Sequence, residues 1–213
     1  MSAHNPPVQR VAISGASGLI GRALSEFLRA RGDEAVHLVR RQPRAVHEIG
    51  WDPATRTLDP GLLSGVTAVV HLAGAGVGDH RWTPAYKHEI LASRVDGTAT
   101  IATALADLGE PIALVSGSAM GAYGDRGDEV LTEDSELGKG FLADVVRAWE
   151  SATKPAQDAG LRVAHAGSRE VNDGRDAGQR TGVECPRRGV PNDLVTGPWL
   201  AADQVHDLVS PGA

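Results

Sequence analysis

Three glycines, Gly15, Gly18 and Gly21, form the pattern in this chain that carries the clearest chemistry. They follow the apolar run 11–13 and precede a segment with an apolar face, which predicts a buried strand, a turn and the start of a helix. Glycine permits the sharp turn, lets main chain approach a ligand, and lets the helix pack closely. Unpaired N–H groups in a first helical turn attract anions, which favours a bound ligand over a glycine-rich turn without one. The predicted site for a dinucleotide diphosphate consists of Gly15, Ser17, Gly18, Leu19, Ile20 and Gly21.

Two consecutive arginines, Arg40 and Arg41, follow the second apolar run, 35–39. In a dinucleotide-binding fold, the residue at the tip of the second strand meets the adenosine ribose. An acidic residue there binds a 2′-hydroxyl, whereas an arginine pairs with a 2′-phosphate. The arginines therefore predict NADP(H) as the cofactor in preference to NAD(H). Solvated charge without a ligand is the alternative role for this pair.

Two later apolar runs also end in small residues. The run 66–72 stops at Ala73-Gly74, and the run 112–115 is followed by a small-residue segment that contains Ser118. Parallel strands place their carboxyl ends at one edge of a sheet, so both endings are expected beside the glycine loop, with Ser118 displayed toward the cofactor. The predicted cofactor contacts in this region are Leu72, Ala73 and Gly74.

The elements that position these residues alternate between strand and helix. Helical apolar spacing follows the glycine loop and recurs over 83–108 and 141–159. This alternation, with right-handed crossovers, predicts an α/β doubly wound parallel sheet, an NAD(P)-binding Rossmann fold with strand order 3-2-1-4-5-6. The predicted strands cover 11–13, 35–39, 49–53, 66–72, 112–115 and 161–164.

The regular pattern ends near residue 165. Residues 166–213 are dense in Gly, Arg, Asp and Pro and show no sustained period of two or 3.6. We therefore expect one NAD(P)-binding Rossmann domain over 8–165 and an irregular, poorly packed tail over 166–213.

The composition restricts the expected partners. The chain has 213 residues, enough for one sizeable core, and a formal net charge of −6. A negative balance argues against nucleic acid or an anionic membrane as the main partner, so a small-molecule substrate is expected. Cys185 is the single cysteine, and no segment approaches about 20 apolar residues or a signal-peptide layout, which predicts a cytoplasmic protein. His80, His88 and the acids near them lack metal-ligand spacing, so no metal site is predicted.

Several motifs together resemble the extended short-chain dehydrogenase/reductase superfamily. They are Gly15-Ala16-Ser17-Gly18-Leu19-Ile20-Gly21, His71-Leu72-Ala73-Gly74, and Ser116-Gly117-Ser118-Ala119 before Tyr123-Gly124. A second set is similar to its atypical, sugar-nucleotide-epimerase-like subgroup, the NAD-dependent epimerase/dehydratase family. That set is Trp51-Asp52-Pro53, Ile90-Leu91-Ala92-Ser93-Arg94-Val95-Asp96-Gly97-Thr98, and Thr132-Glu133-Asp134 leading to Trp149-Glu150. The resemblance extends from residue 9 to the region of residue 165.

The superfamily resemblance implies an active site of Ser, Tyr and Lys with a supporting Asn, in which Tyr is the acid and base and Lys lowers its pKa. Ser118 matches the serine and is the predicted catalytic residue, which would orient a substrate oxygen. Bonding to the cofactor or capping the loop is its alternative role. Leu142 and Val146 occupy the matching Tyr and Lys positions, and neither can transfer a proton.

Two other side chains stand at motif positions. Arg94 occupies the place where the superfamily usually has Asn, and it is predicted to reach a substrate phosphate or carboxylate. An exposed helix arginine is the alternative. His71 ends a strand and is interpreted as a core histidine with satisfied hydrogen bonds rather than a base.

The family resemblance further implies a substrate-binding half of about a hundred residues after the sixth strand. Residues 166–213 do not match it, so we expect a C-terminally truncated member with the substrate domain missing. Three functions stay open. The first is an NADP(H)-binding epimerase/dehydratase-like oxidoreductase acting on a small or nucleotide-linked carbonyl or hydroxyl substrate. The others are a non-catalytic NADP(H)-binding module and an inactive truncated relative.

Overall fold

The computed structural model describes residues 8–126, 129, 131–132 and 135–168. The strands of this part are β1 (Arg10–Ser14), β2 (Glu34–Val39), β3 (Glu48–Gly50), β4 (Ala68–His71), β5 (Ala113–Ala119) and β6 (Val163–Ser168). The helices are α1 (Leu19–Ala30), α2 (Pro84–Leu108), α3 (Phe141–Ser151) and α4 (Lys154–Asp158), with 3₁₀ turns η1 (Pro60–Leu63) and η2 (Met120–Tyr123). Most of the predicted tail, residues 169–213, lies outside the described residues.

The strands form one parallel sheet in the order β3-β2-β1-β4-β5-β6. This order confirms the predicted doubly wound Rossmann fold. It reverses direction between β1 and β4, so the chain leaves these two neighbouring strands toward opposite sides. In register, Ser14 at the end of β1 lies beside His71 at the end of β4, which lies beside Ser116 of β5. The loops after β1 and β4 therefore leave the carboxyl edge of the sheet next to each other.

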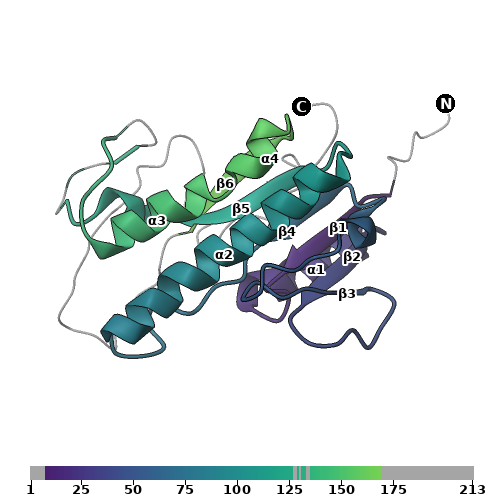
Figure 1. Cartoon of the computed structure of the whole chain (residues 1–213), viewed down its shortest axis with the longest axis horizontal. Coiled ribbons are helices and arrows are strands. Elements are labelled where there is room, and N and C mark those ends of the chain that lie inside the picture. The colour runs from purple at the N-terminus through teal and green to yellow at the C-terminus, as the bar shows by residue number, and fades with distance from the viewer. Residues whose placement is uncertain (1–7, 127–128, 130, 133–134, 169–213) are drawn as a thin grey trace.

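Helices cover both faces of the sheet, and α2 and α3 run side by side across one of them (Figure 1). A buried cluster fills the layer between the sheet and α2 and α4, with Val36, Val69, Ile101, Leu105 and Ala156 among its members. A second cluster fills the α1 side, with Ile13, Leu24, Leu28 and Val70 among its members. Because the sheet is buried on both faces, its central strands have continuous apolar sequences.

The long helix α2 has the ends that the sequence predicts. Thr83 caps its start by accepting a hydrogen bond from Tyr86 N at 3.2 Å, and Pro84 occupies the first turn. Gly109 ends it with a φ of 70° and donates from its N–H to Leu105 O at 3.3 Å. The capped ends fix which turns of α2 reach the edge of the sheet where the loops emerge.

Two strands extend four residues past their predicted ends, whereas β4, Ala68–His71, is shorter than the predicted 66–72. β5 covers Ala113–Ala119 rather than 112–115, and β6 covers Val163–Ser168 rather than 161–164. The added residues of the two strands pair with each other in register from Ser116 onward. They are mostly small or polar, so they lack the apolar run that marks the other strands, although their main chains bond regularly. As a result, β6 continues past the predicted domain limit at residue 165.

Two further predicted elements are altered. The single helix expected over 141–159 is divided at residues 152–153 into α3 and α4. Pro155 has no N–H to continue the helical bonding, and Thr153 Oγ1 donates to Glu150 O at 2.6 Å. The third strand is short and ends at Gly50, before Trp51.

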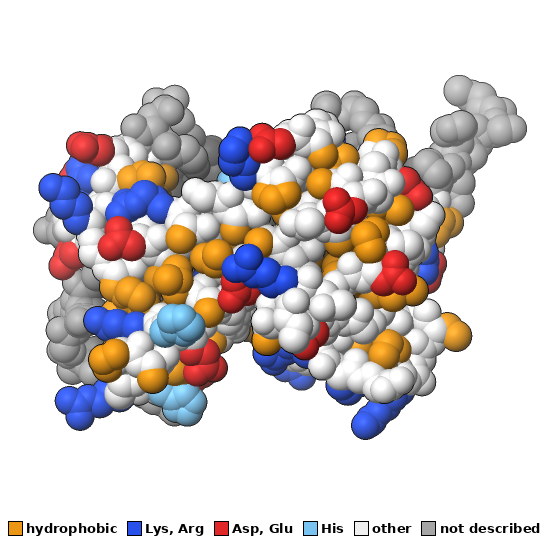
Figure 2. All heavy atoms as spheres, viewed as in Figure 1, with side chains coloured by type: hydrophobic (Ala, Val, Ile, Leu, Met, Phe, Trp, Pro, Cys, Tyr) orange, Lys and Arg blue, Asp and Glu red, His pale blue; other side chains and the backbone are white. Residues whose placement is uncertain are grey.

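The surface of the α2 and α3 face carries acidic and basic side chains interspersed with hydrophobic ones (Figure 2). Among its described residues, this face therefore has no extended area of one charge sign, the feature that a nucleic acid selects. None of the helices in the described ranges combines the length and the apolar character needed to cross a membrane.

Candidate functional site

The glycine loop between β1 and α1 is tightly constrained. Gly15 has a φ of 70°, a conformation that favours glycine, and Gly18 N donates to Gly15 O at 2.9 Å to close the turn. A Cβ on Gly15 would lie 2.9 Å from the carbonyl carbon of Leu72. Gly15 therefore permits the sharp turn, as predicted, and also a close contact with the loop after β4.

Gly21 lets α1 begin directly against the glycine loop. A Cβ on Gly21 would lie 2.3 Å from Gly15 O and 2.7 Å from Ala16 Cα. We expected this close contact between the helix and the sheet, whereas the structure places it between the helix and the loop. Gly18 is the N-cap residue and has no side chain that could accept from the first turn. The N–H groups at the start of α1 are thus left for a ligand to pair with, as a diphosphate site requires.

A cleft of about 1420 Å³ lies in front of the glycine loop, at the carboxyl edge of the sheet. Its volume exceeds the roughly 300–1,000 Å³ of most small-ligand sites and suits an extended dinucleotide. Of the predicted cofactor residues, those lining it are Gly15, Ser17, Gly18, Arg40, Arg41, Leu72, Ala73 and Gly74. Leu19, Ile20 and Gly21 form the first turn of α1 and do not line the cleft. Further lining residues include Trp51, Ser93 and Asp96, which belong to the subgroup motifs but had no predicted role, and His37, which no motif singled out.

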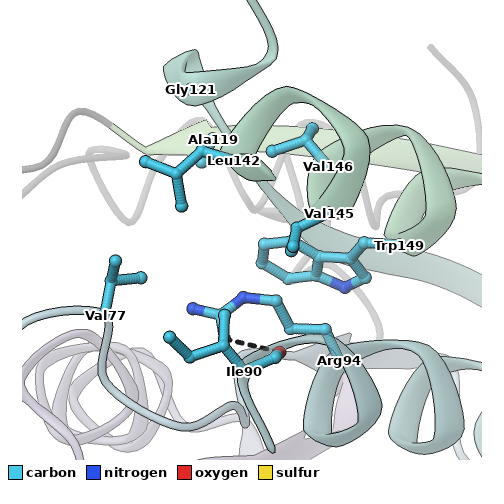
Figure 3. A pocket seen from close by; sticks show the side chains of 9 residues that line it. All are labelled: Val77, Ile90, Arg94, Ala119, Gly121, Leu142, Val145, Val146 and Trp149. Carbon is cyan, nitrogen blue, oxygen red and sulfur yellow. Dashed lines mark hydrogen bonds between the residues drawn. The ribbon is translucent and has the colours of Figure 1, made fainter. Parts of the chain in front are cut away.

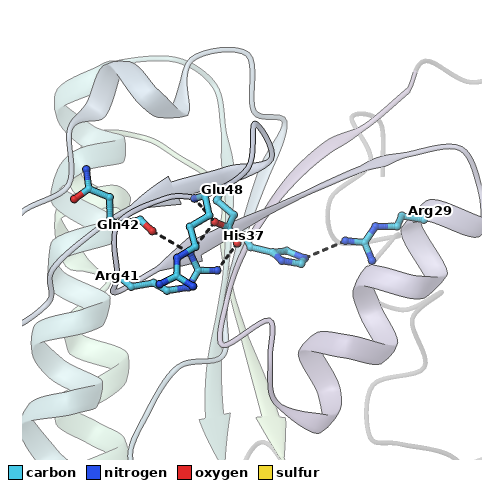
Figure 4. Close-up of polar contacts among 6 residues, drawn as sticks. Arg29, His37, Arg41, Gln42 and Glu48 are labelled. Atoms are coloured by element: carbon cyan, nitrogen blue, oxygen red, sulfur yellow. Dashed lines mark hydrogen bonds and ion pairs between the residues drawn. The ribbon is translucent and has the colours of Figure 1, made fainter.

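The two arginines after β2 have different surroundings. Arg41 donates to both carboxylate oxygens of Glu48, at 2.5 and 2.9 Å, and to Gln42 O at 3.0 Å (Figure 4). These bonds, with a further one from Arg44 N, lower the pKa of Glu48 to about 2. Arg40 is exposed and makes no hydrogen bond or ion pair with any residue that the structure describes. Arg40 is therefore the arginine whose guanidinium is available to a ligand in the cleft.

His37 lines the cleft from the middle of β2. Its Nε2 lies 3.2 Å from Ser25 Oγ and 3.3 Å from Arg29 Nη2, and Figure 4 shows the ring and Arg29 directed at each other. Because the guanidinium can only donate, Nε2 accepts. Burial, followed by the charges of Arg29 and His47, lowers the pKa of His37, which keeps the ring neutral. In the sequence, the only feature of His37 that could indicate a function is its place within an apolar strand. That feature alone does not predict that His37 lines the cleft.

Arg94 of α2 is half-buried, so the alternative of an exposed helix arginine is wrong. Its Nη1 donates to Ala75 O at 2.9 Å and to Ile90 O at 3.1 Å, and its guanidinium carbon lies 5.2 Å from the centroid of the Trp149 ring. Its stem packs against Gly74, because a Cβ on that glycine would lie 3.4 Å from Arg94 Cγ. Arg94 therefore lies behind Gly74, which lines the cleft, and itself lines a smaller cavity but not the cleft.

The smaller cavity, about 30 Å³ in volume, is large enough for a water molecule. Figure 3 shows Leu142, Val145 and Val146 of α3 around it, with Arg94 and Trp149 on one side. Among the described residues, its lining is Val77, Ile90, Arg94, Ala119, Gly121, Leu142, Val145, Val146 and Trp149. Apart from the guanidinium and the indole N–H, this lining is apolar.

Ser118 lies near the end of β5 and is buried. Its hydroxyl donates to Glu150 Oε1 of α3 at 2.5 Å. Ser118 is absent from the described lining of both the cleft and the smaller cavity. The bond to Glu150 connects strand and helix, and a catalytic role for Ser118 stays a prediction.

Residues 11–142 match the NAD dependent epimerase/dehydratase family. This chain belongs to that family. An epimerase family protein of Mycobacterium bovis is 42% identical over 156 residues, which cover 73% of this chain and 52% of the relative. The chain thus spans about half the length of the curated relatives it matches.

Two solved structures of epimerase-family proteins share the fold. One is the nucleoside-diphosphate sugar epimerase of Corynebacterium glutamicum, with 43% identity and a TM-score of 0.66, matching 75% of this chain and 33% of that protein. The other is a human epimerase family protein solved with NADPH, with 29% identity and a TM-score of 0.64, matching 74% of this chain and 52% of that protein. The resemblance to extended short-chain dehydrogenases/reductases is thereby confirmed.

This member of the epimerase/dehydratase family departs from the superfamily pattern where the proton-transfer pair is expected. Leu142 and Val146 lie one helical turn apart on α3, and both line the small cavity. Their side chains carry no titratable group, so these two positions supply neither an acid nor a base.

Proposed function

We propose that this chain binds NADP(H) in the cleft and acts as an epimerase/dehydratase-like oxidoreductase on a small or nucleotide-linked carbonyl or hydroxyl substrate. One observation carries the proposal. The glycine loop and the uncapped first turn of α1 form a cradle in which a Cβ on Gly15 or Gly21 would collide with main chain. Such a cradle fits a diphosphate, because N–H groups and the helix dipole both favour anionic oxygens.

Several parts of the chain would hold the cofactor. Main-chain N–H groups of residues 19–21, next to the lining residue Gly18, would bind the diphosphate, and Arg40 would pair with the 2′-phosphate that distinguishes NADP(H). The segment 72–74 lies opposite and would limit the width of the site. When bound, a nicotinamide dinucleotide supplies hydride transfer. The family description names NAD and the human relative contains NADPH, so the preference for NADP(H) depends on Arg40.

Arg94 is the residue proposed to contact the substrate. Its guanidinium is held by two main-chain carbonyls and by Trp149, so its position is fixed before a ligand arrives. A fixed guanidinium suits a phosphate or carboxylate, because it forms paired hydrogen bonds with both. Ser118 would orient a substrate oxygen only if its hydroxyl left Glu150.

A second candidate function is a module that binds NADP(H) without turnover. The aliphatic side chains of Leu142 and Val146 favour it, since the described lining of the small cavity holds no residue that could transfer a proton. Three readouts distinguish the two functions: NADPH oxidation by simple aldehydes, NADP⁺ reduction by UDP-sugars, and conversion of a UDP-sugar to its epimer. Turnover supports the oxidoreductase, tight binding without turnover supports the module, and an absence of binding indicates an inactive relative.

The binding proposal is tested by Gly18→Val, whose branched side chain would occupy the space of the diphosphate. Gly167→Val is the matched control, because a Cβ on Gly167 in the edge strand β6 meets nothing within 4 Å. In a titration followed by reduced-nicotinamide fluorescence, we expect the Gly18 variant to lose NADPH binding by ~100-fold or more and the control to retain it. Equal affinities of the two variants would refute a diphosphate site at this loop.

A further inference from the structure

A buried pair of side chains joins the two strands that carry the cofactor-facing loops. Ser14 ends β1 and His71 ends β4, side by side in register, and neither is accessible to solvent. Ser14 Oγ lies 2.6 Å from His71 Nδ1. The same oxygen accepts from Leu72 N at 3.1 Å and from Ala73 N at 3.3 Å. One hydroxyl thus contacts the strand end and the loop that follows it.

A count of donors and acceptors indicates which atoms of Ser14 and His71 carry the hydrogens. A serine hydroxyl has one hydrogen to donate and two lone pairs to accept with. The N–H groups of Leu72 and Ala73 use both lone pairs, so the hydroxyl hydrogen is directed at His71 Nδ1. That nitrogen must accept, and the imidazole is therefore neutral with its hydrogen on Nε2.

The surroundings of His71 favour the same neutral form. Its ring meets Trp51 edge to face with centroids 5.9 Å apart, and Gly97 of α2 leaves room for it, since a Cβ there would lie 3.2 Å from the ring. Nε2 has no hydrogen-bond partner among the described residues. Burial, with a smaller contribution from the charge of Arg94 on α2, lowers the pKa of His71 to about 4.

We propose that His71, acting through Ser14, is a positioning residue that holds the glycine loop against the 72–74 segment, and that only its neutral form does so. Gly15 follows Ser14 directly and packs on the carbonyl group of Leu72. A protonated ring would donate from Nδ1 to Ser14 Oγ and occupy a lone pair that a backbone N–H group now uses. Leu72 N would keep its second acceptor, Ser14 O at 3.3 Å, but the hydroxyl would no longer hold both N–H groups. The inference rests on the proposed function, because it concerns the spacing of the two walls of the NADP(H) site.

The test compares His71→Asn with His71→Leu. The two substituted side chains have nearly the same shape, but only Asn offers an oxygen near the position of Nδ1 to accept from Ser14. Ser116→Ala is the matched control, because Ser116 is equally buried beside His71 and its hydroxyl donates to Gly117 O. NADPH dissociation constants are measured at pH 7.5, together with the urea midpoint of each variant.

We expect the Asn variant and the control to bind NADPH within about threefold of the wild type, and the Leu variant to bind about tenfold more weakly. A role in stability alone predicts equal affinities for the folded Asn and Leu variants, and that result would overturn the inference while leaving the proposed function intact. Failure of the wild-type chain to bind NADPH would overturn both.

A second measurement does not depend on how the Leu variant folds. Nitrogen-15 spectra of the histidine side chains identify which ring nitrogen carries hydrogen, and we expect Nε2 for His71 at neutral pH. Hydrogen on Nδ1 would contradict the hydrogen-bond count and the inference with it. Ser14→Ala, compared with Ser116→Ala, is expected to reproduce the affinity loss of the Leu variant, and unchanged affinity would count equally against the inference.

Discussion

At the scale of single residues, the site depends on a few side chains whose neighbours decide what they can do. Arg40 and Arg41 are adjacent in sequence, yet Glu48 engages Arg41 through two hydrogen bonds and leaves Arg40 to the cleft. Ser14 and His71 are 57 positions apart in sequence, yet they share a hydrogen bond beneath the same cleft. Residue type alone does not distinguish Arg40 from Arg41, because the neighbouring side chain in the folded structure decides whether each one is available to a ligand.

Arg40→Ser is expected to weaken NADPH binding by ~10- to 100-fold and to leave NADH binding nearly unchanged, because a charge-assisted hydrogen bond is worth about 1.5–3 kcal/mol. Arg41→Ser is the control, and its ratio of NADPH to NADH affinity should stay close to that of the wild type. Fluorescence titration with both cofactors measures the ratios. A larger change of the NADPH to NADH affinity ratio in the Arg41 variant would show that Arg41, and not Arg40, pairs with the 2′-phosphate.

His71 should make stability depend on pH. Its pKa is about 4 in the folded chain and 6.5 ordinarily, so the unfolded state takes up its proton first as the pH falls. Its contribution is present in full above pH 6.5 and is lost progressively toward pH 4. Between pH 7.5 and 4.5, we expect the wild type to lose about 2–3 kcal/mol more unfolding free energy than His71→Asn. The free energy of unfolding of both proteins is measured by urea denaturation at each pH. An equal change with pH in the two proteins would show that His71 does not titrate in this way.

At the scale of elements, the apolar runs predicted β1, β2 and β4 to within two residues at each end, and the helices α1 and α2, whereas β3 was predicted to continue to residue 53. The central strands β1 and β4 are buried, and Thr83 and Gly109 cap α2, and both features are readable in sequence. The ends of β5 and β6 were not predicted, because residues 116–119 and 165–168 pair through main chain and carry small side chains. The break between α3 and α4 could have been expected from Pro155.

Thr83→Ala tests the start of α2. Loss of the cap bond to Tyr86 N should lower the unfolding free energy by about 1 kcal/mol. Thr103→Ala, at an exposed position within the same helix, should instead be neutral or stabilising by up to ~0.5 kcal/mol. Both are measured by urea denaturation, and NADPH affinity should be unchanged in each. An equal loss in both variants would show that the cap does not stabilise the helix.

The candidate site was predictable to the extent that it lies in contiguous motifs. The G-x-x-G-x-x-G spacing and the small residues after β4 identified the part of the cleft lining formed by Gly15, Ser17, Gly18 and residues 72–74. Leu142 and Val146 identified the missing proton-transfer pair. The pairing of Arg41 with Glu48 and the position of Arg94 over Trp149 could not be predicted. Each joins residues from different elements, and sequence spacing does not report which side chains meet after folding.

At the scale of the whole molecule, the single parallel sheet positions the glycine loop, the 72–74 segment and the cleft. Its order reverses between β1 and β4, and the cleft lies at that reversal, where open α/β sheets bind their ligands. The described part of the chain carries this cleft, and the matched residues cover about half of the curated relatives.

The central claim is that the first-turn N–H groups of α1 bind the diphosphate, and amide spectra of the nitrogen-15-labelled chain test it most directly. On titration with NADPH, we predict that the amide signals of residues 19–21 shift further than those of the rest of α1 and approach a plateau. Unmoved signals at these residues, with saturable shifts elsewhere, would contradict the claim and place the ligand at a different site.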